Sequence, residues 1–213
     1  MGKEDMFENR THAGKLLAEK LRHFSGKDAV VYALPRGGVV VGAEVARKLR
    51  VPLDIVVVRK IGHPNNPEYA IGAVAEGDVL IENTDERSCL NESERARIVK
   101  REQEEIERRR KIYTGKKRFS PREKIAIIVD EGLATGFTMR AALLSVRNEK
   151  PMKIIVAVSV APHAVVSELQ TLADEVVVLD SDENFLGAVG AYYQDFEQVD
   201  DKQVVEALKG ITS

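Results

Sequence analysis

Residues 125–138, IAIIVDEGLATGFT, decide the fold. The stretch begins with five apolar residues, continues with Asp130 and Glu131, and leads through small residues and hydroxyls into a predicted helix. A strand that is apolar at every position is typical of a parallel sheet covered by helices on both faces. Because ligands of such sheets bind outside the carboxyl ends of the strands, we expect the functional residues at those ends.

The same alternation of short apolar strands and helices extends along the chain in both directions. Strands are predicted over residues 29–34, 53–58, 125–129, 153–160 and 175–179, and helices over residues 13–24, 39–49, 138–148 and 164–173. Residues 71–75 and 79–82 flank a turn-like triplet and predict a hairpin. We therefore expect an α/β fold with a parallel sheet of about five strands, helices on both faces and a small added hairpin.

Residues 91–113 predict a long charged helix inside an insertion of about residues 84–118. Its acidic and basic residues recur in the favourable order four positions apart. Val99, Ile106 and Tyr113 form a thin apolar stripe at heptad spacing, which predicts a surface helix packed along one narrow seam; a lid or partner surface is the alternative. The 213 residues predict one domain that carries this insertion.

The overall charge and composition are those of an ordinary globular protein. With 32 basic and 34 acidic residues the net charge is -2, so no overall field favours nucleic acid or an anionic membrane as partner. Cys89 is the single cysteine, which excludes an internal disulfide and fits a reducing compartment. No signal-like segment and no apolar run near the length of a membrane span is present. We expect a cytoplasmic protein.

The turn after the strand at 125–129 is suited to binding a phosphate monoester. It comprises Ala134, Thr135, Gly136, Phe137 and Thr138. Small residues at a helix N-terminus expose several backbone N–H groups, and the helix dipole favours an anion there. The two threonines add hydroxyl donors. The alternative is a capped strand-to-helix turn without a ligand.

Two adjacent carboxylates, Asp130 and Glu131, precede this turn. One acid alone could cap the helix, whereas two need several donors or a cation, and vicinal ribose hydroxyls fit that need. A carboxylate pair beside a phosphate cradle therefore predicts a site for a sugar phosphate.

Two further groups of residues could hold anions. Arg36, Gly37 and Gly38 follow the first strand and offer a guanidinium group and two unobstructed amides; a simple tight turn is the alternative. Arg59 and Lys60 end the second predicted strand ahead of a predicted mobile loop over residues 62–68, and a solvated basic strand end is their alternative.

The remaining candidates for chemistry are weaker. Four aromatic residues gather near the C-terminus and could stack on a base, but their spacing favours core: Phe185, Tyr192, Tyr193 and Phe196. The four histidines have no metal-ligand spacing, and Cys89 has no activating neighbour in the sequence.

The segment from Asp130 to Thr138 resembles the signature of the type I phosphoribosyltransferase family, in which an apolar strand precedes two acids, a small residue, Thr, Gly, any residue and Thr. The resemblance covers most of the chain from about Phe7. Within the family, the chain is most similar to stand-alone members whose acceptor is generally unassigned. It also rests on residues 34–46 (LPRGGVVVGAEVA), 56–77 (VVVRKIGHPNNPEYAIGAVAEG) and 184–196 (NFLGAVGAYYQDF). Glu131 as second acid and Phe137 in place of a common Gly depart from the family pattern.

The resemblance implies transfer of ribose 5-phosphate from 5-phosphoribosyl 1-pyrophosphate (PRPP) to an unidentified acceptor, such as a nucleobase, in nucleotide metabolism. It assigns the 5-phosphate to residues 134–138, and the pyrophosphate to Arg36, Gly37, Gly38, Arg59 and Lys60. The catalytic set is then Asp130, Glu131, Arg36 and Lys60. Mg²⁺ is the implied cofactor, held by Asp130 and Glu131 directly or through water. A homodimer is compatible with the resemblance.

Two other classes of function stay open from the sequence. A non-catalytic regulatory protein could bind PRPP or a nucleotide with the same phosphate cradle. An aspartyl-phosphate phosphohydrolase also places an Asp after an apolar strand, but it usually has a second Asp two residues on, where this chain has Gly132. No P-loop motif occurs.

Overall fold

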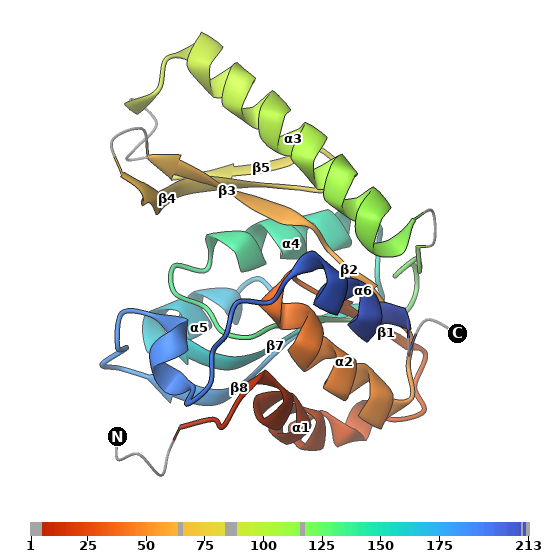
Figure 1. The fold of residues 1–213 in the computed structure, drawn as a ribbon. Helices are drawn as coiled ribbons and strands as arrows, with labels where there is room; N and C mark the ends of the chain where they lie inside the picture. Colours follow the sequence, from red (N-terminus) through yellow and green to blue (C-terminus); the bar gives the residue numbers. More distant parts are fainter. Residues whose placement is uncertain (1–5, 64–65, 84–88, 116–117, 210, 212–213) are drawn as a thin grey trace.

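Two sheets organise the molecule, in a computed structural model that describes residues 6–63, 66–83, 89–115, 118–209 and 211 (Figure 1). The larger sheet is parallel, with strand order β2-β1-β6-β7-β8. Its strands are β1 (Ala29–Ala33), β2 (Leu53–Ile55), β6 (Ile125–Asp130), β7 (Lys153–Pro162) and β8 (Glu175–Asp182). The predicted α/β fold with a five-stranded parallel sheet is thus confirmed.

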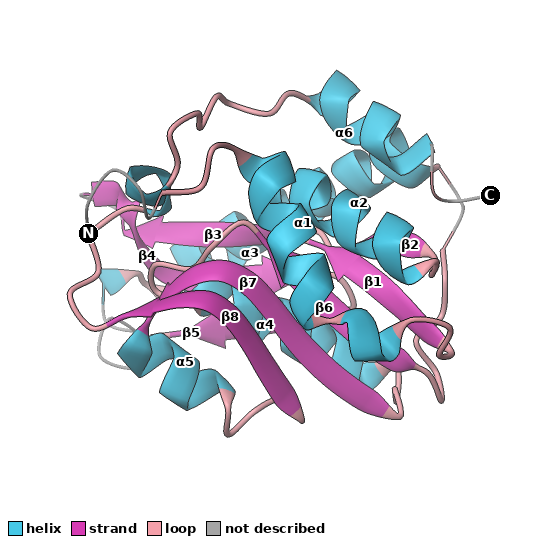
Figure 2. Ribbon diagram, turned by 90° about the horizontal axis from the view of Figure 1, so that it is seen from below, coloured by secondary structure: helices cyan, strands magenta, loops and turns pink. Residues whose placement is uncertain are grey.

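Helices cover both faces of the parallel sheet (Figure 2). One face packs against α1 (Arg10–Lys20) and α2 (Gly37–Leu49), and the other against α4 (Phe137–Asn148) and α5 (His163–Leu169). Alternate residues of β6 point to opposite faces: Ile127 packs on the α2 side and Ile128 on the α4 side. Burial of both faces explains why these strands are apolar throughout.

A second sheet of three antiparallel strands lies on the outer side of α4, so that α4 separates it from the parallel sheet (Figure 1). It contains β3 (Val58–His63), β4 (Asn66–Ala75) and β5 (Val79–Glu82), so the hairpin predicted at residues 71–82 is present and has one more strand. One face packs against α4, and the other against α3 (Glu92–Thr114) (Figure 1).

The second strand and the loop after it differ from the sequence prediction. The run at residues 53–58 does not form one strand, because β2 ends at Ile55 and β3 begins at Val58 in the other sheet. Arg59 and Lys60 therefore lie within an antiparallel strand rather than at the end of a parallel one. The loop predicted over residues 62–68 is largely strand, and its residues 64–65 lie outside the described residues.

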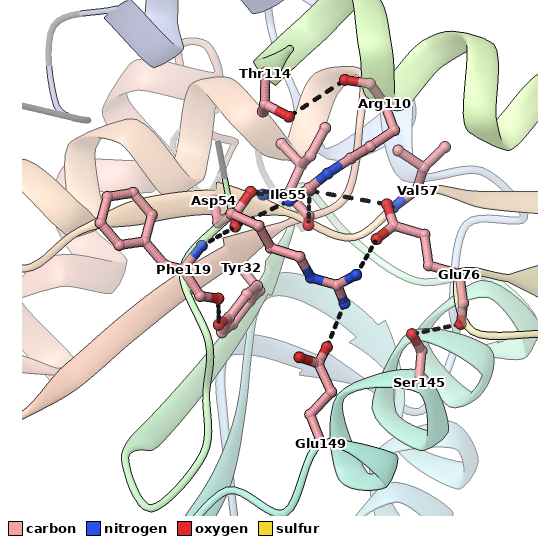
Figure 3. Close-up of polar contacts among 11 residues, drawn as sticks. Tyr32, Asp54, Ile55, Val57, Glu76, Arg110, Thr114, Phe119, Ser145 and Glu149 are labelled. Carbon is pink, nitrogen blue, oxygen red and sulfur yellow. Dashed lines mark hydrogen bonds and ion pairs between the residues drawn. The ribbon is translucent and has the colours of Figure 1, made fainter. Parts of the chain in front are cut away.

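A buried group of charged side chains joins the two sheets and α3 (Figure 3). Asp54 of β2 is 2% exposed and accepts a hydrogen bond from the Phe119 amide at 2.8 Å. Arg110 of α3 lies 2.8 Å from Asp54 and 3.8 Å from Glu76, the residue after β4. Arg118 in turn contacts Glu76 and Glu149. Because each buried carboxylate has a cationic partner, this network fixes α3 and the antiparallel sheet on the core.

The long charged helix predicted over residues 91–113 is present as α3. Asn91 caps α3, with its side chain accepting from the Glu94 amide while the Glu94 side chain accepts from the Asn91 amide. Ile106 and Tyr113 of the predicted seam are buried, and Val99 packs partly buried against the core.

Other helix boundaries depart modestly from the prediction. The first helix ends at Lys20 and continues as a short 3-10 turn, with Leu16 exposed rather than buried. The sequence analysis missed α6 (Asp201–Lys209), which packs against α2 and α3. Within the described residues, no helix is long and apolar enough to cross a membrane.

Candidate functional site

The acid pair lies at the carboxyl end of β6, directly against the first turn of α2. A Cβ atom on Gly38 would approach Asp130 Oδ1 to 2.7 Å, and one on Gly37 would overlap the Glu131 carboxylate. Gly37 and Gly38 therefore lie inside the first turn of α2, where the absence of side chains admits both acids. The structure brings together two groups of predicted site residues that are far apart in sequence.

Arg10 of α1 is a site residue that the sequence analysis missed. Its Nε bonds the Glu131 carboxylate, and its Nη1 donates to the main-chain oxygen of Glu197 at 2.7 Å. Its guanidinium carbon lies 3.8 Å from the centre of the Phe196 ring. No local pattern marks Arg10, because its partners are distant in the chain. The second acid is thus held as one half of an ion pair.

Asp130, unlike Glu131, has no direct bond to Arg10 among the described contacts. Its Oδ1 accepts a hydrogen bond from the Glu131 amide at 2.8 Å. Burial, reinforced by the negative charge of Glu131, raises the pKa of Asp130 well above its usual value. A cation or a hydroxyl donor at this position would offset that burial and favour the ionised form.

The turn from Gly132 to Gly136 exposes the amides that a phosphate needs. Five consecutive N–H groups have no acceptor within the described part of the chain; they belong to Ala134, Thr135, Gly136, Phe137 and Thr138. Gly136 adopts a φ of +74°, a backbone conformation that residues other than glycine rarely adopt. No side chain caps α4. Unsatisfied amides at a helix N-terminus, together with the helix dipole, are suited to an anion, so residues 134–138 remain the candidate phosphate cradle.

Phe137 packs without filling this turn. Its ring belongs to an apolar cluster with Ala73 and Ala75 of β4, and the Arg140 guanidinium carbon lies 4.3 Å from the ring centre. The large side chain therefore joins α4 to the antiparallel sheet. Its amide stays available for an anion.

Two of the three predicted cations have acidic partners that the sequence did not indicate. Arg36 Nη1 lies 3.9 Å from Asp201 Oδ1 of α6. Arg59 Nε donates to Glu102 Oε2 of α3 at 2.9 Å. Lys60 is exposed and has no ion-pair partner among the described residues. Arg59 thus contacts α3, whereas Lys60 is exposed.

One cavity of about 760 Å³ lies beside several of these residues, although neither acid of the pair is in its lining. Its lining includes Pro35 beside the α2 turn, Thr138 beside the phosphate cradle, and Arg59 and Lys60 of β3. A hollow of about 860 Å³ also exists between α1 and β8, but none of the predicted site residues lines it. We place the functional site at the first cavity because it adjoins both the cradle and the basic residues.

The C-terminal aromatic residues are mainly core, as predicted. Tyr192 and Tyr193 are buried, and Phe185 and Phe196 pack against them partly exposed. The Tyr193 hydroxyl donates to the main-chain oxygen of Glu131 at 2.6 Å. The segment therefore supports the acid pair from behind.

The donor set fits a hydrated magnesium ion rather than a fully enclosed metal. Among the described residues, no three or more His, Cys, Asp or Glu side chains gather in a group that could hold a metal. Asp130 and Glu131 offer hard carboxylate oxygens. Mg²⁺ commonly retains several waters and binds through one or two carboxylates together with substrate oxygens.

The sequence matches the model of the phosphoribosyl transferase domain over residues 5–195. The chain belongs to this family. Two curated proteins of Mycobacterium tuberculosis, each named "putative phosphoribosyl transferase", are 40% identical over 211 residues, which cover 95% of this chain and 46% of theirs. The chain therefore spans about half the length of these curated relatives.

Solved structures share the fold of this chain. The crystal structure of TT1426 from Thermus thermophilus is 41% identical, covers 98% of this chain and 100% of its own, and has a TM-score of 0.79. The AQ2163 protein of Aquifex aeolicus has a TM-score of 0.51 at 11% identity, covering 81% of this chain and 74% of its own, and shows likeness of fold alone. The phosphoribosyltransferase fold expected from the sequence is thus confirmed.

Proposed function

We propose that this protein transfers the 5-phosphoribosyl group of PRPP to an acceptor nucleophile, such as a nucleobase, and releases pyrophosphate. The observation that carries the proposal is the set of five adjacent amides without acceptors in the described chain, residues 134–138, directly after Asp130 and Glu131. A phosphate monoester and two vicinal hydroxyls, separated by the width of a pentose, satisfy those donors and acids together.

Each part of the site has a defined task in this reaction. The amides of residues 134–138 would hold the 5-phosphate, and Asp130 and Glu131 would accept hydrogen bonds from the ribose hydroxyls. The carboxylates then lie where positive charge develops on the ribose ring as the anomeric carbon loses pyrophosphate. Bound magnesium would neutralise charge on the departing pyrophosphate. The carboxylate oxygens of Asp130 and Glu131 would hold the magnesium ion.

Cations and amides would stabilise the leaving group. Arg36, Gly37 and Gly38 flank Pro35 at one end of the cavity, and Arg59 and Lys60 line it. Arginine and lysine donors form charge-assisted hydrogen bonds with phosphate oxygens. Contacts with Asp201 and Glu102 help to orient Arg36 and Arg59, respectively. This arrangement suits pyrophosphate better than a neutral ligand.

Two measurements on the whole protein test the proposal. With Mg²⁺ and PRPP present, a panel of nucleobases and other nucleophiles is screened for pyrophosphate release, and calorimetry measures binding of PRPP and ribose 5-phosphate. The proposal expects binding of both sugar phosphates and release that depends on the acceptor. Tight PRPP binding without release for any acceptor indicates the regulatory alternative instead. Absence of binding contradicts both.

A further inference from the structure

The inserted helix α3 lines the same cavity as the predicted site residues. Among the described residues that line the cavity, cations outnumber acids: Glu102 is the one carboxylate beside Arg59, Lys60, Arg97, Arg101 and Arg109. Arg109 is also paired with Glu105, at 2.7 Å. Three of these arginines come from α3, which the sequence analysis interpreted mainly as a surface helix. An excess of cations along one cavity indicates a ligand with several negative charges.

Glu102 arranges two of the guanidinium groups. It is 4% exposed, and its oxygens accept from Arg59 Nε at 2.9 Å and from Arg101 Nη2 at 2.7 Å. Burial opposes its ionisation, but the hydrogen bonds from Arg59 and Arg101 prevail and lower the pKa of Glu102. The carboxylate is therefore charged at neutral pH and holds the two arginines together.

Several donors of this array remain for a ligand. Within the described chain, Arg59 uses only Nε on Glu102, so both of its terminal amino groups are available. Arg97 precedes Arg101 by one helical turn and has no ion-pair partner among the described residues. Lys60 likewise has no ion-pair partner among the described residues. Fixed guanidinium groups beside further cations match the oxygens of two linked phosphates.

We propose that α3 forms one wall of a diphosphate-binding site, with Arg97 and Arg101 contacting the diphosphate and Glu102 positioning Arg59. The inference rests on the proposed function for its assignment to the pyrophosphate of PRPP. The cavity reaches from Pro35 to Thr138, so a diphosphate there adjoins the 5-phosphate cradle.

The decisive variant is Arg97→Gln, because Arg97 makes no ion pair that its loss could break within the described chain. Lys100→Gln is the matched control: it removes one charge from an exposed position of the same helix outside the cavity. Calorimetry with Mg²⁺ compares pyrophosphate, PRPP, ribose 5-phosphate and ADP. We expect Arg97→Gln to lower the affinities for pyrophosphate and PRPP at least fivefold, and the double variant Arg97→Gln with Arg101→Gln to lower them at least twentyfold. The affinity of these variants for ribose 5-phosphate should change less than twofold. All affinities of the Lys100→Gln control should also change less than twofold.

The outcomes separate the two proposals. Unchanged pyrophosphate and PRPP affinities in both α3 variants overturn the diphosphate site, even when wild-type PRPP binding supports the proposed function. Pyrophosphate binding that needs Arg97, without any binding of ribose 5-phosphate, supports the diphosphate site and contradicts the proposed function. ADP binding tighter than PRPP with the same dependence on Arg97 assigns the diphosphate to a nucleotide and overturns the assignment to PRPP. If the wild type binds none of the four, both proposals fail.

Discussion

Gly37 and Glu131 are packed so closely that a single added methyl group would overlap the acid. A Cβ atom on Gly37 would lie 1.8 Å from Glu131 Oε2, whereas one on Gly38 would meet Asp130 Oδ1 at 2.7 Å and the β6 main chain at 3.1 Å. The first conflict involves the end of a flexible side chain, and the second involves backbone as well. The two glycines therefore have separable roles.

Gly37→Ala is expected to displace the Glu131 carboxylate and lower ribose 5-phosphate affinity about tenfold, or ~1.4 kcal/mol. The free energy of unfolding should change by less than about 1 kcal/mol, since Ala favours the first turn of a helix. Gly38→Ala should cost about 1–3 kcal/mol of stability, because backbone must move. Calorimetry and urea unfolding measure both. Equal effects of the two changes on stability would contradict this account of the packing.

Arg10→Met should destabilise the protein by about 1–3 kcal/mol, because it leaves the half-buried Glu131 carboxylate without its partner. The change also removes a charge that lowers the pKa of Asp130, so the pKa of Asp130 should rise further. Arg22→Met, at an exposed position, serves as the control. Urea unfolding of the three proteins at one pH measures the effect. A loss no larger than that of the control would show that the Arg10–Glu131 pair contributes nothing.

Much of the site could be predicted because its signals are local. The cradle follows Asp130 and Glu131 directly, and glycine, hydroxyl and helix-start preferences act within a few residues. The same locality fails for Arg10, whose partner Glu131 is 121 positions away. No periodicity marks such a pair. Its formation depends on α1 lying next to the end of β6, which only the packed fold determines.

The division of residues 53–58 between two sheets could not be predicted from the sequence pattern either. Leu53, Ile55, Val56 and Val57 are all buried, so the run has the pattern of one central strand. Asp54 was the one sign in the sequence that this run is not an ordinary central strand, because a buried acid needs a cationic partner. Arg110 of α3 supplies that partner. The same long-range packing brings Glu102 to Arg59 and makes α3 part of the cavity.

The buried network in Figure 3 predicts a pH dependence of stability. Burial is the largest cause that raises the pKa of Glu76 above its model-peptide value of 4.5. The folded state therefore binds this proton more tightly than the unfolded state does. The contribution of Glu76 to stability is fully present below pH 4.5 and is lost as pH rises through the higher pKa of the folded state.

Glu76→Gln removes this titration and keeps an oxygen for the Val57 amide, which donates to Glu76 Oε1 at 3.0 Å. Relative to this variant, the wild type should gain stability as pH falls from 7 toward about 4.5, the ordinary glutamate range. Glu104→Gln, at an exposed position of α3, is the control. Denaturant unfolding at several pH values measures the difference. A wild-type advantage that instead shrinks on acidification would reverse the assigned direction of the pKa shift.

The central claim is that Asp130 and Glu131 bind a pentose whose phosphate occupies the turn at residues 134–138. Asp130→Asn with Glu131→Gln keeps the shape of both side chains and removes their charge. Calorimetric titration with ribose 5-phosphate, in the presence of Mg²⁺, tests the claim most directly. The account predicts at least a tenfold loss of affinity, ~1.4 kcal/mol or more, in a variant that still unfolds cooperatively. An affinity equal to that of the wild type would contradict it.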